Sequence, residues 1–103
     1  MTEVEADELR QAVEQMHGCR ASLREVTPVI ERFKGQKAWD GTVHVFALTG
    51  HPTATVCYAW SSPIDGSERR RFYAVLHSPP VASPLDAVRA AIITDYKSGN
   101  TPI

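Results

Sequence analysis

Three segments of strand-forming residues follow one another between residues 42 and 77, and they constrain the fold more than any other feature. They cover residues 42–48, 54–60 and about 69–77, and they are rich in β-branched and aromatic residues. The connection 49–52 reads Thr-Gly-His-Pro, a tight-turn signal, and the connection 61–67 is the most turn-prone stretch of the chain. Because short connections join antiparallel neighbours, these segments predict an antiparallel meander.

An amphipathic helix is predicted at the N-terminal end, from about Thr2 to His17. Its apolar residues recur at positions i, i+3, i+4 and i+7, the spacing of one helix face: Leu9, Ala12, Val13 and Met16. Acidic residues crowd its first turns, where the helix dipole favours negative charge. Gly18 follows the last apolar position and is a good C-terminal stop.

A second helix is predicted near the C-terminal end. Ser83 is a typical N-cap, Pro84 suits the first helical position, and Asp86 lies where a capping-box acid is found. The expected buried stripe consists of Leu85, Val88, Ala91, Ile92 and Tyr96. Gly99 is the expected stop, and we expect residues 100–103 to fray.

Segment 19–34 is ambiguous in the sequence. Thr27-Pro28 could begin a short helix, but the β-branched and aromatic residues that follow favour a strand. We prefer the strand, with Pro28 placing it at a sheet edge because proline cannot donate to a ladder. Residues 34–37 would then form the loop to the next strand, with Trp39-Asp40-Gly41 as a turn or bulge that leads into it.

The resulting element order is α-β-β-β-β-α, an α+β fold with three to four antiparallel strands flanked by two helices. A chain of 103 residues, of which 43% are hydrophobic and 22% charged, fits one globular domain over residues 1–103.

The faces of the predicted strands are both apolar. If the turn at Gly50-His51 pairs Phe46 with Val56, and the longer loop pairs Val56 with Tyr73, two faces result. The first carries large aromatic residues: His44, Phe46, Leu48, Val56, Tyr58, Trp60, Tyr73 and Val75. The second carries smaller residues: Val43, Val45, Ala47, Cys57, Ala59, Phe72, Ala74 and Leu76. A sheet with one face in water should alternate apolar with polar residues, so both faces of this sheet should be covered.

The two helices could share one face or cover one face each. If they share a face, the aromatic face must meet another molecule, since large exposed apolar patches mark interaction sites. We therefore expect a non-catalytic binding or assembly module that forms a homodimer or binds a protein partner through this face. The residues of that face are His44, Phe46, Tyr58, Trp60 and Tyr73.

Two other functions stay open. A cleft between sheet and helices, lined by His44, Tyr58 and Tyr73, would bind a small ligand or a substrate. A weak nucleic-acid site could use Arg69, Arg71 and the loop Lys34–Lys37. The formal net charge of −1 argues against a dedicated nucleic-acid binder, which usually carries a net basic charge.

No motif for catalysis, a cofactor or a metal ion is recognisable. His51 and His77 are predicted at the same end of the sheet and could begin a metal site, but spacing indicates no third ligand. Cys57 is expected to be a small buried hydrophobic residue. Two cysteines, no secretory signal and no membrane-length apolar run favour a cytoplasmic protein with free thiols.

Overall fold

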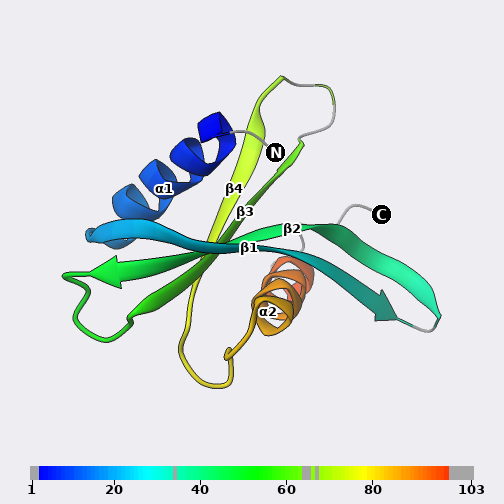
Figure 1. Ribbon diagram of the computed structural model, residues 1–103. Helices are drawn as coiled ribbons and strands as arrows, with labels where there is room; N and C mark the ends of the chain where they lie inside the picture. The colour runs from blue at the N-terminus through cyan, green and yellow to red at the C-terminus, as the bar shows by residue number, and fades with distance from the viewer. Residues whose placement is uncertain (1–2, 34, 64–65, 67, 98–103) are drawn as a thin grey trace.

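The computed structural model describes residues 3–33, 35–63, 66 and 68–97, and it has the predicted element order (Figure 1). The elements are α1 (Glu3–His17), β1 (Arg20–Phe33), β2 (Gln36–Thr49), β3 (Val56–Pro63), β4 (Arg70–Leu76) and α2 (Pro84–Lys97). The predictions for Lys34, Gly99 and the tail 100–103 lie outside the described residues. The α+β class of the fold is confirmed.

The four strands form one antiparallel sheet in the order β1-β2-β3-β4, which is the predicted meander. The ambiguous segment is the long strand β1, not a helix. It lies at the edge of the sheet, which is where a strand that contains Pro28 is tolerated. Trp39-Asp40-Gly41 does not form a turn; it lies inside β2. One of the two register irregularities between β1 and β2 lies beside it, because Glu31 pairs with Trp39 and Arg32 with Lys37, which leaves Ala38 of β2 as the extra residue.

The helix ends follow the local chemistry of the chain. Gly18 has φ of 63°, and its N–H donates to the Glu14 carbonyl at 2.9 Å, which ends α1. At the start of α2, the Asp86 N–H donates to Ser83 Oγ at 3.1 Å. The Asp86 carboxylate accepts the N–H of Ala82 at 3.1 Å, so the predicted cap is confirmed.

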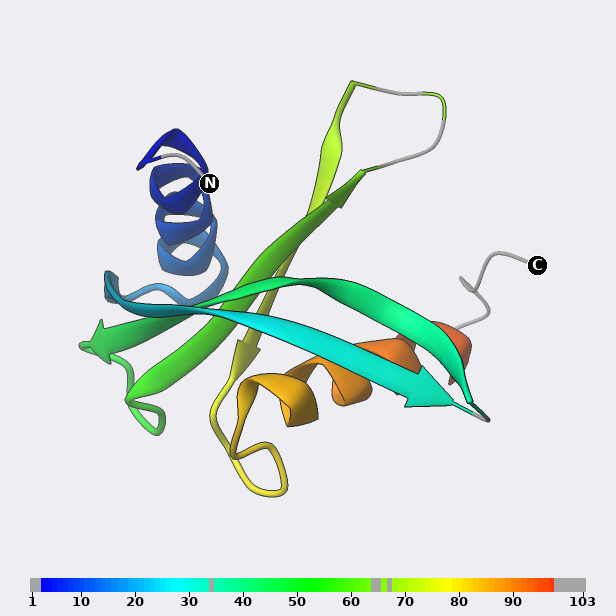
Figure 2. The same cartoon turned by 45° about the vertical axis from the view of Figure 1, so that its right-hand side comes forward.

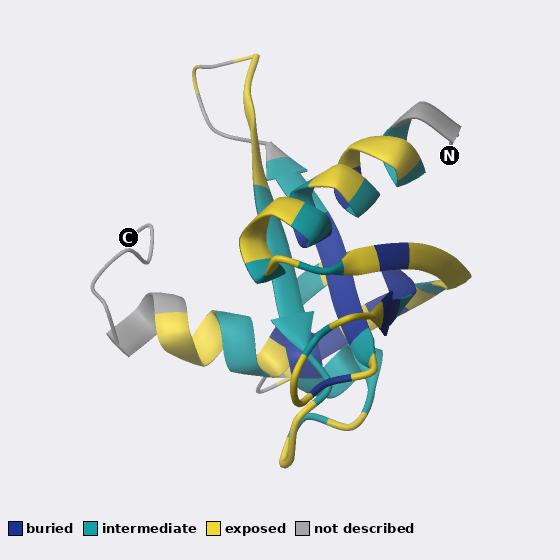
Figure 3. Cartoon of the chain, turned by 90° about the vertical axis from the view of Figure 1, so that its left-hand side faces the viewer, coloured by how far each residue is buried: buried dark blue, intermediate teal, exposed yellow. Residues whose placement is uncertain are grey.

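Each helix covers one face of the sheet, so the buried residues gather between α1 and α2 (Figure 3). The core under α1 contains Leu9, Val13, Ala21, Phe46, Leu48, Ala54, Cys57 and Ala59. The core under α2 contains Val29, Val43, Val45, Tyr58, Trp60, Ala87 and Val88. The arrangement in which both helices share a face is therefore not the one observed.

The predicted pairing of β2 with β3 was wrong by one residue. Phe46 pairs with Cys57 instead of Val56, and this slip moves every side chain of β2 to the other face relative to β3. The β3–β4 pairing also differs, because Tyr73 faces Trp60 rather than Val56. That shift is an even number of residues, so the predicted common face of β3 and β4 is kept.

The sheet splits into two diverging hairpins. The ladder between β2 and β3 contains only the pairs from His44–Ala59 to Ala47–Val56. Beyond it, hairpin β1–β2 and hairpin β3–β4 run in different directions (Figure 2). We call the space between the two hairpins the wedge.

One ion pair fixes α2 to the edge of the sheet. The Arg89 guanidinium donates to the carboxylate of Glu31 on β1, and Glu31 is almost fully buried. This hydrogen bond lowers the pKa of Glu31 below its ordinary value, because the guanidinium stabilises the ionised carboxylate. Among the described residues, no helix is both long and apolar enough to cross a membrane.

Candidate binding cleft

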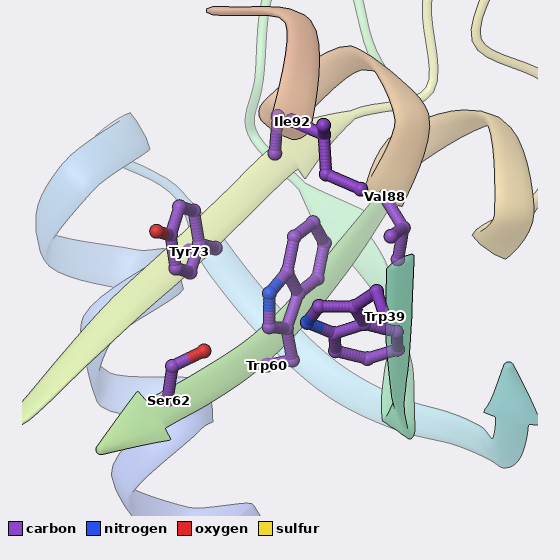
Figure 4. Close-up of a pocket in the computed structure, with 7 residues that line it drawn as sticks. Trp39, Trp60, Ser62, Tyr73, Val88 and Ile92 are labelled. Atoms are coloured by element: carbon purple, nitrogen blue, oxygen red, sulfur yellow. The ribbon is translucent and has the colours of Figure 1, made fainter. Parts of the chain in front are cut away.

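A row of three aromatic rings crosses three neighbouring strands on the face covered by α2. Trp39 of β2, Trp60 of β3 and Tyr73 of β4 contribute one ring each (Figure 4). Trp60 stacks on Tyr73, with centroids 5.1 Å apart and planes at 12°. Trp39 meets Trp60 edge to face at 5.9 Å and 66°. Both geometries are favourable for aromatic pairs, so the row is a well-packed platform.

Gly41 allows the ring of Trp39 to lie against its own strand. A Cβ atom at Gly41 would be 2.8 Å from Cη2 and 2.9 Å from Cζ2 of Trp39, closer than real Cβ contacts occur. Glycine inside a strand often marks such a close approach. The position of the Trp39 ring therefore requires that residue 41 has no side chain.

A small apolar cavity lies between the aromatic row and α2. Its volume is about 100 Å³, and α2 contributes Val88, Ala91 and Ile92 to its wall (Figure 4). Among the described residues that line it, Ser62 is the only one that is neither aliphatic nor aromatic. A cavity of this size and lining can accept a branched aliphatic group of a few carbon atoms.

A larger polar cavity lies in the wedge between the diverging hairpins. Its volume is about 450 Å³, within the usual range for ligand sites. Its lining consists of Glu5, Trp39, Asp40, Gly41, Thr42, Ser61, Ser62 and Arg70. Trp39 and Ser62 line both cavities, so the two adjoin. We call the two cavities together the aromatic cleft.

The wedge is partly organised by hydrogen bonds from Arg70. Its Nε donates to Ser61 Oγ at 2.8 Å, and its Nη2 donates to the Ser61 carbonyl at 3.1 Å. These bonds hold the start of β4 to the end of β3, beside the polar cavity. Arg71 donates to Tyr73 Oη at 3.5 Å, at the outer end of the aromatic row.

The five residues predicted to share one face do not share it. His44 and Phe46 lie on the α1 side, with their rings stacked at 6.3 Å and 15°. Tyr58, Trp60 and Tyr73 lie on the α2 side. Of the five, only Trp60 and Tyr73 line the aromatic cleft, and Tyr58 instead forms a 2.6 Å hydrogen bond with His77 Nδ1.

His44 is fully buried, and neither of its ring nitrogens has a hydrogen-bond partner in the described part of the chain. Its facing residues on the neighbouring strands, Val26 and Ala59, are apolar. Burial lowers the pKa of His44 because it penalises the charged ring, while the negative charge of Glu5 acts in the opposite direction. His44 is therefore neutral in the folded protein near neutral pH.

The histidines suspected of metal binding have separate neighbours. The His51 ring lies 6.1 Å from that of His17, and His51 Nδ1 accepts the N–H groups of Thr53 and Ala54. His77 is bonded to Tyr58 on the α2 side. Within the residues that the structure describes, no group of three or more His, Cys, Asp or Glu side chains could hold a metal ion.

Cys57 is fully buried in the α1-side core, as predicted. Burial raises the pKa of its thiol to about 12, so it carries no appreciable thiolate at neutral pH.

The residues considered for nucleic-acid binding are only partly described. Arg69 and Arg71 are exposed, Lys34 lies outside the described residues, and the side chain of Lys37 is not described. Nucleic-acid binding through these residues stays a prediction.

No family model, no curated protein and no solved structure matches this chain. The case for a function therefore depends on the geometry of the cleft. Sequence reasoning missed Trp39, Asp40, Ser62 and Arg70 as a group. The one signal that could have drawn attention to them is Gly41, a glycine two residues after a tryptophan inside a strand pattern.

Proposed function

We propose that the protein is a non-catalytic binding module whose ligand occupies the aromatic cleft. The observation that carries the proposal is the junction of the two cavities at Trp39 and Ser62. An apolar end and a polar end, joined in one concave surface, suit a ligand that has both an aliphatic group and hydrogen-bonding groups. We place this activity in the cytoplasm, where the free thiols of Cys19 and Cys57 would persist.

The two ends of the aromatic cleft differ in the side chains that line them. The aromatic rings and the α2 residues Val88 and Ile92 would take the aliphatic group, since burial of apolar surface stabilises the complex. Hydroxyl groups and the charged side chains around the wedge would bond the polar part. We therefore still propose the binding module predicted from the sequence, but we place its ligand in the aromatic cleft rather than on the whole aromatic face.

The cleft can be tested with two small probes, isoamyl alcohol and leucinamide. We expect saturable shifts of the indole N–H signals of Trp39 and Trp60 in NMR titrations, because these are the only two tryptophans and both line the cleft. Ala91→Leu should abolish the shifts by filling the apolar cavity. Ala90→Leu is the matched control on the same helix, since Ala90 does not line the cavity. Equal binding by the two variants, or no saturable shift with either probe, would contradict the proposal.

Self-association is a second candidate, supported by a different surface from the one predicted. Leu23, Val26 and Ile30 of β1 are 46%, 40% and 49% exposed. They face Phe46, His44 and Asp40 of β2, so all three lie on the α1 side of the sheet. This apolar stripe lies on β1, the edge strand of the described sheet, and an edge strand is a template for pairing with another copy.

Light scattering after size-exclusion chromatography should then give twice the mass of one chain. Val26→Lys should return the protein to one chain, because it places a charge in the middle of the stripe. Ser22→Lys is the control, since Ser22 is exposed on the same strand but is not apolar. A single-chain mass for the unmodified protein at high concentration would exclude the dimer.

A further inference from the structure

The inner edge of β2 has no ladder with β3 where the two hairpins diverge. β2 begins at Gln36, and its ladder with β3 begins at His44, which leaves eight residues, 36–43, without a partner strand on that side among the described residues. Their other side is paired with β1, apart from Ala38, which has no register partner there. A row of strand N–H and C=O groups therefore faces the wedge, in the manner of a sheet edge.

The aromatic cleft lies directly beside this free edge. Trp39, Asp40, Gly41 and Thr42 belong to the part of β2 that precedes its ladder with β3, and they also line the polar cavity. Asp40 is exposed, and its three neighbours are half-buried, so the edge is accessible there. The apolar cavity opens from the same place, since Trp39 belongs to both cavities.

We infer that the ligand of the aromatic cleft is an extended peptide that adds as a strand to the inner edge of β2 and places one branched aliphatic side chain in the apolar cavity. The inference rests on the proposed function. In strand addition, main-chain hydrogen bonds supply affinity and pockets for alternate side chains supply specificity. This wedge has both parts, a strand edge that forms no ladder with β3 and a pocket of about 100 Å³.

The chemistry of the wedge also specifies the neighbouring residues of the peptide. Side chains of a strand alternate between faces, so the residues on either side of the aliphatic one point to the other face of β2. The polar cavity is lined there by Glu5, Thr42 and Ser61, together with Arg70. Polar or charged flanking residues fit this lining, and consecutive aliphatic residues do not.

The test uses six-residue peptides with acetylated and amidated ends. Leu, Val or Ile is fixed at the third position, and polar residues fill the others. The tightest binder by calorimetry is then resynthesised with a single N-methyl group at each amide in turn. Strand addition predicts an alternating pattern: N-methylation of every second amide weakens binding roughly tenfold, and N-methylation of the amides between them has little effect. Ala91→Leu should weaken the parent peptide, whereas Ala90→Leu should not.

The outcomes separate the two proposals. If N-methylation shows no alternation, or if no peptide binds while isoamyl alcohol still shifts the Trp39 and Trp60 signals, strand addition is wrong and the cleft remains a small-molecule site. If neither peptides nor small probes bind, both proposals are overturned.

Discussion

Replacing Trp60 by alanine should lower the free energy of unfolding by about 3–5 kcal/mol, the usual cost of truncating a large buried aromatic side chain. Trp60 is 2% exposed and lies between the two other rings of the aromatic row. The substitution removes both ring contacts and leaves a void beneath α2. A loss of this size is a large part of the stability of a single domain and should lower the melting temperature by roughly 15 °C or more.

The matched comparison is Trp39→Ala, which removes the same side chain from a half-buried position. We expect a smaller loss, about 1–2 kcal/mol, because less apolar surface returns to water. Urea denaturation followed by circular dichroism measures both variants. Equal losses of unfolding free energy would contradict the prediction that Trp60 contributes more to stability than Trp39.

Local chemistry was enough to predict the elements of this fold. The cap at Ser83, the stop at Gly18 and the edge position of Pro28 depend on residues close in sequence, and the structure has all three. The pairing of β2 with β3 was not predictable in this way. Both faces of β2 are apolar, so hydrophobic alternation cannot choose between two registers that differ by one residue.

The register is instead set by the connection between these strands. The Leu48 N–H donates to the Thr55 carbonyl at 2.8 Å, and His51 Nδ1 accepts two N–H groups within the turn. Gly50 adopts φ of 90° there. Turn rules based on residue composition do not consider a histidine side chain that accepts hydrogen bonds within the turn. For this reason the predicted β2–β3 pairing was wrong by one residue.

The cleft was harder to predict than the fold, because it depends on where a ladder ends. Nothing in residues 36–43 indicates that they pair with β1 but not with β3. The two hairpins diverge beyond the short β2–β3 ladder, with α1 packed on one face of the sheet and α2 on the other. Trp39 and Arg70, which are far apart in sequence, line the same cavity in this arrangement.

Replacing His44 by leucine should stabilise the protein and remove a loss of stability in mild acid. His44 is fully buried without a hydrogen-bond partner among the described residues, and leaving a buried polar group unpaired costs about 1–3 kcal/mol. An apolar side chain avoids that cost, so we expect His44→Leu to raise the free energy of unfolding at pH 7.5 by about 1–2 kcal/mol. His44→Phe, with a ring able to stack on Phe46, is a second variant in case leucine packs poorly.

The pH dependence follows from the lowered pKa of His44. The unfolded chain has a histidine pKa near 6.5, and burial lowers the value in the folded protein. As the pH falls below about 6.5, the unfolded state takes up a proton that the folded state does not bind. The free energy of unfolding should therefore decrease by up to about 1.4 kcal/mol per pH unit until the pH reaches the folded pKa.

The pH window separates His44 from the Glu31–Arg89 ion pair. Glu31 also has a lowered pKa, but its contribution is lost only as the pH falls below about 4.5, the ordinary value for glutamate. Between pH 7.5 and pH 5, the difference between the unmodified protein and the His44 variants thus reports on His44 and not on Glu31. Both His44 variants should show a flatter profile than the unmodified protein over this range. Parallel profiles for all three proteins would mean that His44 is protonated equally in the folded and unfolded states, and that its buried, unpaired position does not govern the acid sensitivity of the fold.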